Sequence, residues 1–231
     1  MLAETQWAAI FTAAKRRGAR WPDNADVLAF KREIETALGP CESAGTVDLA
    51  AFFDTMRKSR VLGPTLSPGE VQGCEAIIEA CAGWPVAWTA YALATAYHET
   101  AGTMQPIREY GRGKGRKYGK VGKYPPNVPY GRGYVQLTWD FNYEKADKEL
   151  GLNGALLKDF DLALDPAIAA QIMVRGMREG WFTGKSLSTY LPDNGPATLA
   201  QFKDARRIIN GTDKADLIAR HALEFQKGLL A

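Results

Sequence analysis

The sequence predicts a mainly α-helical α+β domain with a small β element and a groove beside it. Apolar residues recur at helical spacing along most of the chain, one segment is apolar nearly all round, and one short segment alternates with the period of a strand. The chain has 231 residues, of which 46% are hydrophobic and 24% charged, so it can bury the core of one main domain.

The beginning of the chain is interpreted as a separate extension. Residues 4–17 and 25–38 have the pattern of two amphipathic helices joined by a turn, and Gly39-Pro40 ends the second helix. We therefore divide the chain into a helical N-terminal extension, residues 1–42, and a main domain, residues 46–231.

The next two segments are predicted to be helices of the main core. The first begins near Val47 and ends before Gly63-Pro64, and its apolar residues have helical spacing: Leu49, Phe52, Phe53 and Met56. The second begins at Ser67, because the order Ser, Pro, Gly, Glu matches an N-cap, an N1 proline and an N3 glutamate.

The segment from Pro85 to Tyr97 predicts the central helix of the domain. It contains the sequence VAWTAYALATAY, which only Thr89 and Thr95 interrupt, and such a pattern is typical of a helix buried on every side. We expect Gly102 to be the C′ residue that ends this helix.

A long loop and several shorter elements complete the main domain. Residues 111–133 contain seven glycines and predict an irregular loop, whereas Tyr134–Trp139 alternates polar and apolar side chains and predicts a short strand. Further helices are predicted over about 142–150, from Asp165-Pro166 through Arg178, over 197–208 and over 213–228.

The net charge of +3 is unevenly distributed. Between Arg108 and Arg132 there are eight basic residues and one acidic residue, Glu109, which gives this segment a local charge of +7. We name residues 108–132 the basic segment. Such a segment predicts contact with an anionic or polar polymer at one place, and a solvated loop without a partner is the alternative.

The cysteines, the histidines and the N-terminus argue against a disulfide-bonded protein, a metalloprotein and a membrane-spanning protein. Cys41, Cys74 and Cys81 have no CxxC spacing, so neither a disulfide framework nor a zinc site is expected. His98 and His221 are too few for a metal site, and no cofactor is implied. The N-terminus reverses the charge order of a secretory signal, and no apolar run reaches the length of a membrane span. We therefore expect synthesis in the cytoplasm without a signal peptide.

Two glutamates are candidates for acid–base chemistry. Glu99 ends the buried helix, where partial burial and the negative end of the helix dipole both favour a carboxylic acid that keeps its proton. Glu109 lies between Arg108 and Arg112, which should keep it ionised. One protonated and one ionised carboxylate can divide the acid and base roles of a reaction. The alternatives are a surface glutamate at position 99 and a structural salt bridge at position 109.

The predicted strand adds polar side chains to this region. Its period of two puts Tyr134, Gln136 and Thr138 on one face, which could line a groove, while Val135, Leu137 and Trp139 pack inward. An edge strand with one wetted face would show the same pattern.

Three stretches carry a family resemblance. They are AYHETAGTMQPIREYG at 96–111, YGRGYVQLTWDFNY at 130–143, and RRIINGTDKADLIARHALEFQ at 206–226. Together they resemble the family 19 glycoside hydrolases, the chitinases and phage-type endolysins, in order over residues 46–231. The resemblance implies a lysozyme-like catalytic domain that binds its substrate in a groove.

The same resemblance implies roles for individual residues. Glu99 would be the general acid, Glu109 the general base of an inverting hydrolase, and Thr138 the residue that holds the attacking water. The expected sugar-binding residues are Tyr134, Gln136, Asn142 and Asn210, and the expected supporting residues are Arg220 and His98. A helix stop at Asn210-Gly211 and a solvated helix face at Arg220 are the alternatives.

The resemblance implies cleavage of β-1,4 glycosidic bonds. Plant chitinases of the family usually carry disulfides, and an Asp, Asp140, stands where their motif commonly has Asn or His. The stretch HETAGTMQPIREYG looks closer to the bacterial and phage members of the family. This likeness favours peptidoglycan, cut by an endolysin that a holin releases onto the wall, with chitin as the alternative substrate. A lytic transglycosylase would not need Glu109, and a wall-binding or nucleic-acid-binding module would need neither glutamate. We expect a monomer that does not bind nucleic acid.

Overall fold

A computed structural model describes residues 47–231, so the predicted extension over residues 1–42 lies outside the described residues. Its α-helices are α3 Leu49–Ser59, α4 Pro68–Ala80, α5 Val86–Glu99, α6 Asp140–Leu150, α7 Ala155–Lys158, α8 Pro166–Glu179, α9 Leu199–Ala205 and α10 Ala215–Leu229. The 3-10 helices are η1 Phe160–Leu164, η2 Leu187–Thr189 and η3 Arg206–Ile208, and the strands are β1 Ile107–Arg108 and β2 Arg132–Gly133. The predicted mainly α-helical fold with a small β element is confirmed.

Two helices begin at the caps that the sequence predicts. The Ser67 side chain accepts a hydrogen bond from the backbone N–H of Glu70, whose carboxylate accepts one from the Ser67 N–H at 2.7 Å. The Asp165 carboxylate accepts hydrogen bonds from the N–H groups of Ala167 and Ile168, both at 3.0 Å. These bonds satisfy backbone donors that have no partner inside the helix.

Helix α5 is the buried centre of the domain, as predicted. Nine of its residues are buried, including every one from Thr89 to Ala96. The helix ends one position earlier than we expected, because Ala101, with φ of 52°, is the C′ residue. Gly102 is therefore C″, and its N–H donates to the carbonyl of Tyr97 at 2.8 Å.

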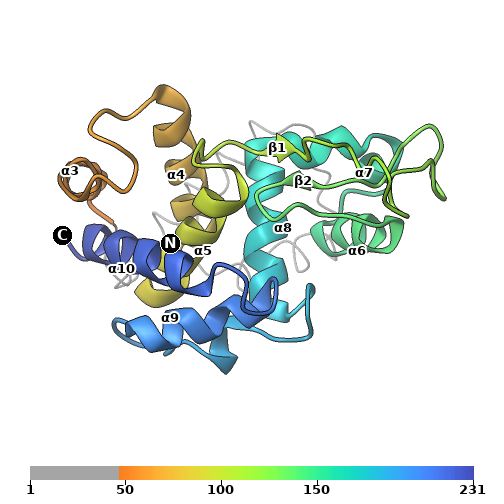
Figure 1. Ribbon diagram of the computed structural model, residues 1–231. Helices are drawn as coiled ribbons and strands as arrows, with labels where there is room; N and C mark the ends of the chain where they lie inside the picture. Colours follow the sequence, from red (N-terminus) through yellow and green to blue (C-terminus); the bar gives the residue numbers. More distant parts are fainter. Residues whose placement is uncertain (1–46) are drawn as a thin grey trace, which may run out of the picture. The chain divides into compact units, whose positions relative to one another are not determined.

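The remaining helices cover α5 and fix the direction of its carboxyl end. Helix α10 packs against α5, α9 and α3, while α4 packs against α8 and α5. In Figure 1, α6 and α7 lie on the side of α8 opposite to α3 and α10. The chain after α5 leads to β1, which pairs with β2, and β2 precedes α6.

The predicted strand Tyr134–Trp139 is wrong. The strand is β2, which ends before this segment and pairs antiparallel with β1. The chain then turns back, since the N–H of Leu137 donates to the Arg132 carbonyl at 2.8 Å. Gln136, within the segment that we predicted to be a strand, has a positive φ of 53°, which strand residues with side chains do not adopt. The alternation of polar and apolar residues over 134–139 therefore belongs to a tight turn and not to a strand.

The described residues show free thiols and no candidate membrane span. Cys74 and Cys81 are buried and not bonded to one another, and burial raises the pKa of both thiols. Cys41 lies outside the described residues. Within residues 47–231, no helix is long and apolar enough to cross a membrane.

Candidate active site

Glu99 lies at the last position of α5 and contacts a buried arginine. Arg206 Nη1 lies 2.9 Å from Glu99 Oε1, and the side chains of Arg206 and Glu99 are 2% and 19% exposed. The Arg206 Nε–H donates to the carbonyl of Asp213 at 2.9 Å, which fixes the guanidinium. This cation stabilises the charge of Glu99 and opposes the effects of burial and of the helix dipole. Glu99 is therefore a half-buried partner in an ion pair and not a freely solvated surface residue.

Glu109 follows β1 and is held by neutral donors. Its Oε2 accepts a hydrogen bond from the Gly131 N–H at 3.1 Å, and its Oε1 accepts one from the Tyr118 hydroxyl at 3.2 Å. The backbone N–H of Glu109 donates to the Gly131 carbonyl at 2.7 Å. Both carboxylate oxygens are thus oriented by residues of the basic segment, on the side of the loop that leads into β2.

The two arginines that flank Glu109 in sequence do not pair with its carboxylate. Arg108 instead forms an ion pair with Asp161, with 2.6 Å between Nη2 and Oδ2. Arg112 contacts Glu109 through its backbone N–H, which donates to the Glu109 carbonyl at 2.9 Å. The ion pairs that we expected from Arg108 and Arg112 to the Glu109 carboxylate are therefore not formed, because alternate side chains of β1 and the following turn point in different directions.

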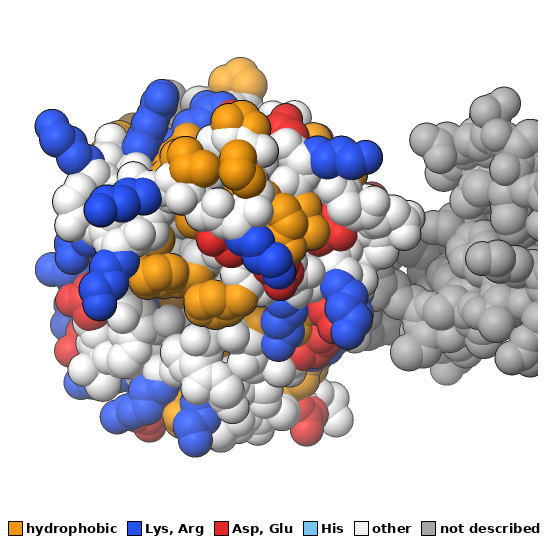
Figure 2. All heavy atoms as spheres, turned by 90° about the vertical axis from the view of Figure 1, so that its right-hand side faces the viewer, with side chains coloured by type: hydrophobic (Ala, Val, Ile, Leu, Met, Phe, Trp, Pro, Cys, Tyr) orange, Lys and Arg blue, Asp and Glu red, His pale blue; other side chains and the backbone are white. Residues whose placement is uncertain are grey.

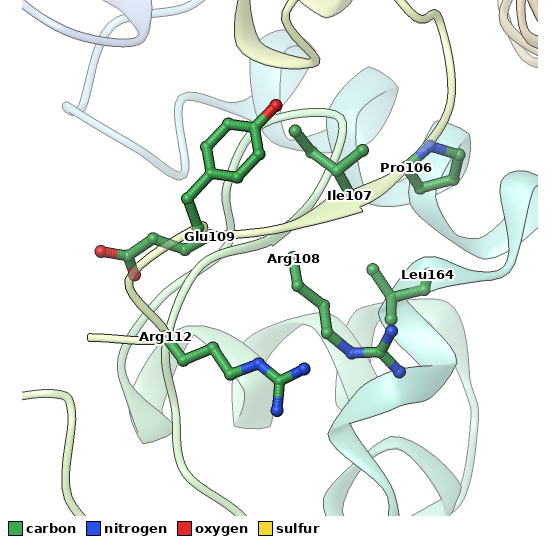
Figure 3. Close-up of a pocket in the computed structure, with 7 residues that line it drawn as sticks. Pro106, Ile107, Arg108, Glu109, Arg112 and Leu164 are labelled. Carbon is green, nitrogen blue, oxygen red and sulfur yellow. The ribbon is translucent and has the colours of Figure 1, made fainter. Parts of the chain in front are cut away.

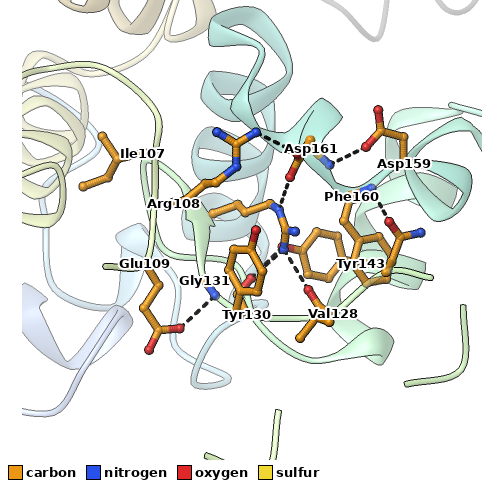
Figure 4. A network of polar contacts seen from close by, with 12 residues as sticks. Ile107, Arg108, Glu109, Val128, Tyr130, Gly131, Tyr143, Asp159, Phe160 and Asp161 are labelled. Carbon is orange, nitrogen blue, oxygen red and sulfur yellow. Dashed lines mark hydrogen bonds and ion pairs between the residues drawn. The ribbon is translucent and has the colours of Figure 1, made fainter. Parts of the chain in front are cut away.

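A buried arginine anchors the end of the basic segment (Figure 4). Arg132 in β2 donates from Nε to Asp161 at 2.7 Å, and from Nη1 to the carbonyls of Val128 and Tyr130 at 2.9 and 3.0 Å. Its guanidinium also lies 3.7 Å from the centre of the Tyr130 ring. Burial alone would raise the pKa of Asp161, but hydrogen bonds from Arg108 and Arg132 lower it below the usual value. This network fixes the backbone that carries the donor to Glu109.

The turn after β2 corrects two expectations. Tyr134 is fully buried, and its hydroxyl has no hydrogen-bond partner among the described residues. It therefore packs in the core and cannot line a groove, contrary to our prediction. Trp139, which we expected to pack inward, is 38% exposed. Both errors come from the strand prediction, because a turn does not keep the two-residue alternation of faces.

The other predicted residues of this segment remain near the surface. Gln136 is half-buried, and its Nε2 donates to the carbonyls of Ile107 and Gly133, both at 3.2 Å, which ties the turn to β1. Thr138 is half-buried, and its carbonyl accepts a hydrogen bond from Asn142 Nδ2 at 2.7 Å. The sugar-binding and water-holding roles of these three side chains remain predictions.

The late motif contributes a residue that the sequence analysis missed. Asn210 and Arg220 are both exposed, and the ion pair with Glu99 is formed by Arg206 instead of Arg220. Arg206 begins the matched stretch RRIING and lies near the end of the helix predicted over 197–208, so its place in this stretch was the available signal. Sugar binding by Asn210 stays a prediction.

His98 lies next to His221 of α10. Burial lowers the pKa of His221, and the charge of His98 lowers it further. The ring of His221 also meets the ring of Tyr97 edge-on, with 5.0 Å between centroids. A supporting role of His98 in catalysis stays a prediction. Within residues 47–231, no group of three or more histidine, cysteine or acidic side chains is arranged to hold a metal ion.

A pocket opens beside Glu109 (Figure 3). Its volume is about 430 Å³, and its lining residues are Pro106, Ile107, Arg108, Glu109, Tyr110, Arg112 and Leu164. The guanidinium groups of Arg108 and Arg112 lie on the same side of β1 in this view, whereas the carboxylate of Glu109 points away from them. The pocket therefore combines apolar walls with two cations.

Exposed aromatic rings lie near the same part of the domain. The rings of Trp139 and Phe141 are stacked, with 6.3 Å between centroids, and Tyr118 meets Trp139 edge-on at 5.3 Å. Phe141 is 62% exposed. Figure 2 looks onto the end that carries α6 and α7 and shows hydrophobic side chains among lysines and arginines. Such a surface can contact both the apolar faces and the charged groups of a polymer.

Comparison with known proteins shows that the chain is similar to chitinases. No protein-family model matches the sequence. An endochitinase of Arabidopsis thaliana is 37% identical over 103 residues, which cover 43% of this chain and 33% of that protein. Endochitinase A of Zea mays is 30% identical over 92 residues, which cover 39% of this chain and 30% of that protein. The matched region thus spans about a third of the length of these curated relatives.

The solved structures extend the likeness to most of the chain. Chitinase C of Streptomyces griseus HUT6037 superposes with a TM-score of 0.57 and 22% identity, over 84% of this chain and 79% of that protein. The predicted resemblance to the chitinases is confirmed, in fold over most of the chain and in sequence over a shorter region.

Proposed function

We propose that the chain is a glycoside hydrolase that cleaves β-1,4 bonds in a polymer of N-acetylated amino sugars. The observation that carries this proposal is a pair of glutamates with different partners, Glu99 on a buried cation and Glu109 on neutral donors, in a chain with the fold of a chitinase. Two carboxyl groups in unlike environments are what hydrolysis of a glycosidic bond requires.

In the proposed mechanism, Glu99 donates its proton to the glycosidic oxygen. Glu109 accepts a proton from a water molecule that attacks the anomeric carbon from the opposite face, with Thr138 holding that water. The bond to the leaving sugar breaks as the water oxygen bonds to the anomeric carbon, so the configuration inverts. The hydrogen bonds from Tyr118 and Gly131 support the role of Glu109, because donors of this kind stabilise an ionised carboxylate.

Chitin is the first substrate to consider. The relatives in Arabidopsis thaliana and Zea mays are both named endochitinases, and the similar solved structure is that of a chitinase. These names support chitin better than they support peptidoglycan.

Peptidoglycan is the second candidate, and the charge of the basic segment favours it. Eight basic residues against one acidic residue would attract a wall polymer that carries carboxylates, whereas chitin is uncharged and would gain little. With this substrate, release onto the wall by a partner such as a holin would bring the enzyme to it.

Digestion of purified chitin and purified peptidoglycan, with the products identified by mass spectrometry, tests the function. We expect the wild-type chain to release products with ordinary reducing ends. Glu99→Gln and Glu109→Gln should each lower the rate by about 10² to 10⁴, because one removes the proton donor and the other the base. Both variants should keep the wild-type circular dichroism spectrum.

Other outcomes would replace the proposal with a named alternative. Products that end in an anhydro sugar, together with full activity of Glu109→Gln, would indicate a lytic transglycosylase. Binding to the polymers without cleavage would indicate a wall-binding module. Proton NMR of fresh products should show the α-anomer first, and initial release of the β-anomer would exclude the role of Glu109 as base in an inverting reaction.

A further inference from the structure

The pocket beside Glu109 has an unusual combination of lining groups. Pro106, Ile107 and Leu164 give it apolar walls, and the guanidinium groups of Arg108 and Arg112 add two positive charges. Figure 3 shows both guanidinium groups on the side of β1 away from the Glu109 carboxylate. A ligand in this pocket therefore meets two cations at a place next to the proposed base.

The two arginines differ in their interactions within the protein. Arg108 is held by its ion pair with Asp161, whose carboxylate also receives a hydrogen bond from Arg132. Arg112 is exposed and forms no ion pair or side-chain hydrogen bond with any of residues 47–231. Its guanidinium keeps all of its donors available for a ligand, and Arg108 supplies a fixed positive charge in the same pocket.

The backbone at Arg112 is part of a tight turn. The N–H of Lys114 donates to the carbonyl of Gly111 at 2.8 Å, and the two central residues of this turn, Arg112 and Gly113, have positive φ of 45° and 72°. The turn leaves the Arg112 side chain exposed at the pocket.

We propose that Arg112, assisted by Arg108, binds a carboxylate that the glycan substrate carries on a substituent of its sugars or on an attached peptide. A planar guanidinium recognises a carboxylate with two parallel hydrogen bonds, and the apolar walls suit the carbon atoms of the substituent. The inference rests on the proposed glycosidase function and selects carboxylate-bearing amino-sugar polymers, such as peptidoglycan, over neutral chitin.

Two forms of one substrate isolate the contribution of the carboxylate. The first is a soluble glycan-strand fragment of peptidoglycan with free carboxylates, and the second is the same fragment after conversion of the carboxylates to methylamides. The size and shape of the substituents change little, so the ratio of kcat/KM between the two forms measures recognition of the charge. A chitin oligosaccharide of equal length gives the rate on a neutral chain.

The variants are Arg112→Gln and a matched control, Arg60→Gln. Arg60 is also exposed, also has a positive φ of 60°, and forms no ion pair with the described residues, but it does not line the pocket. Each substitution removes one positive charge. The wild type and Arg60→Gln should both prefer the free carboxylate by about tenfold, and Arg112→Gln should lose that preference.

Three results would overturn the proposal. These are an unchanged preference in Arg112→Gln, an equal loss in Arg60→Gln, and the absence of any preference in the wild type. If the wild type cuts none of the three substrates, the proposed glycosidase function fails. Titration calorimetry of the two fragments with wild type and Arg112→Gln then tests the carboxylate site by itself, because the same loss of preference must appear in Kd.

Discussion

The two candidate glutamates have partners of opposite character. Glu99 shares a hydrogen bond with the buried guanidinium of Arg206, while Glu109 receives hydrogen bonds from the Tyr118 hydroxyl and the Gly131 N–H. In the proposed mechanism, the carboxylate that remains after Glu99 gives up its proton is the form that pairs with Arg206 in the structure. The acid role of Glu99 and the base role of Glu109 remain predictions.

Tyr118 is predicted to position Glu109. Tyr118→Phe removes the hydroxyl that donates to Glu109 Oε1 at 3.2 Å, so the carboxylate loses one of the two hydrogen bonds that orient it. The value of kcat/KM at neutral pH should therefore fall by about two- to fivefold. The measurement is kcat/KM on a chitin or peptidoglycan oligosaccharide at neutral pH.

Tyr190→Phe is the matched control for Tyr118→Phe. Tyr190 is half-buried, and its hydroxyl forms no hydrogen bond with the described residues. Its kcat/KM should equal that of the wild type. An unchanged kcat/KM in Tyr118→Phe would mean that the hydroxyl does not position Glu109.

The sequence identified both glutamates but not their partners. Glu99 and Glu109 could be found because a buried helix and a basic segment are local patterns. Arg206 is 107 residues from Glu99 along the chain, so only the packing of the folded domain brings the two together. Tyr134 was misassigned for the opposite reason, since a local alternation was interpreted without the turn that buries its ring.

At the scale of elements, Asp161 connects three parts of the small end of the domain. It lies in η1 and forms ion pairs with Arg108 in β1 and Arg132 in β2. Arg132 in turn holds the carbonyls of Val128 and Tyr130, just before the Gly131 donor to Glu109. Loss of the Asp161 carboxylate should therefore loosen Arg132 and, through the backbone at Gly131, weaken the hydrogen bond to Glu109.

Asp161→Asn is predicted to lower stability and activity together. It leaves the buried Arg132 without a counter-charge, which should lower the free energy of unfolding by about 1–3 kcal/mol at pH 7, since Asp161 itself is partly exposed. The folded-state pKa of Asp161 is lowered, so its contribution is present above the unfolded value near 3.9 and is lost as the pH falls through the folded value. Urea unfolding at pH 7 and near pH 3 should show the difference from wild type shrinking at the lower pH.

Asp54→Asn is the matched control for this charge removal. The hydrogen bond from Lys58 lowers the pKa of Asp54, but both side chains lie exposed on α3. Its effect on unfolding should be well below that of Asp161→Asn, and its kcat should equal that of the wild type. Equal effects of the two substitutions would show that the ion pairs around Arg132 contribute no more to stability and activity than an exposed ion pair.

Helices were predictable here and strands were not, for a physical reason. Helix starts such as those of α4 and α8 depend on caps within three residues, which the sequence displays directly. Strands β1 and β2 contain two residues each and pair across the whole basic segment, so neither has a period of its own. The two strands are held together by the ion pairs of Asp161 with Arg108 and Arg132, which join residues far apart in the sequence and so leave no local pattern.

At the scale of the molecule, charge and chemistry are concentrated together. The basic segment ends at β2 and supplies Glu109, its two hydrogen-bond donors and the arginines of the pocket. Its field extends over about 8–10 Å at ordinary ionic strength, which is enough to act on a polymer that approaches the pocket. Under the proposed function, the same segment would attract a charged wall polymer and position Glu109.

The last prediction separates this attraction from catalysis. Replacing the four exposed residues Lys114, Arg116, Lys117 and Lys120 by Ser should weaken binding to peptidoglycan and remove most of its dependence on salt, because the field of the basic segment is reduced. Hydrolysis of a short neutral chitin oligosaccharide should change much less. A control that replaces the exposed residues Arg57, Lys158, Lys185 and Lys214 by Ser removes the same charge elsewhere and should keep wild-type binding at each salt concentration. Sedimentation with insoluble peptidoglycan and with chitin at low and high salt measures both effects. A clear preference for chitin in all three proteins, unchanged by salt, would identify the chain as a chitinase whose basic segment does not select the polymer.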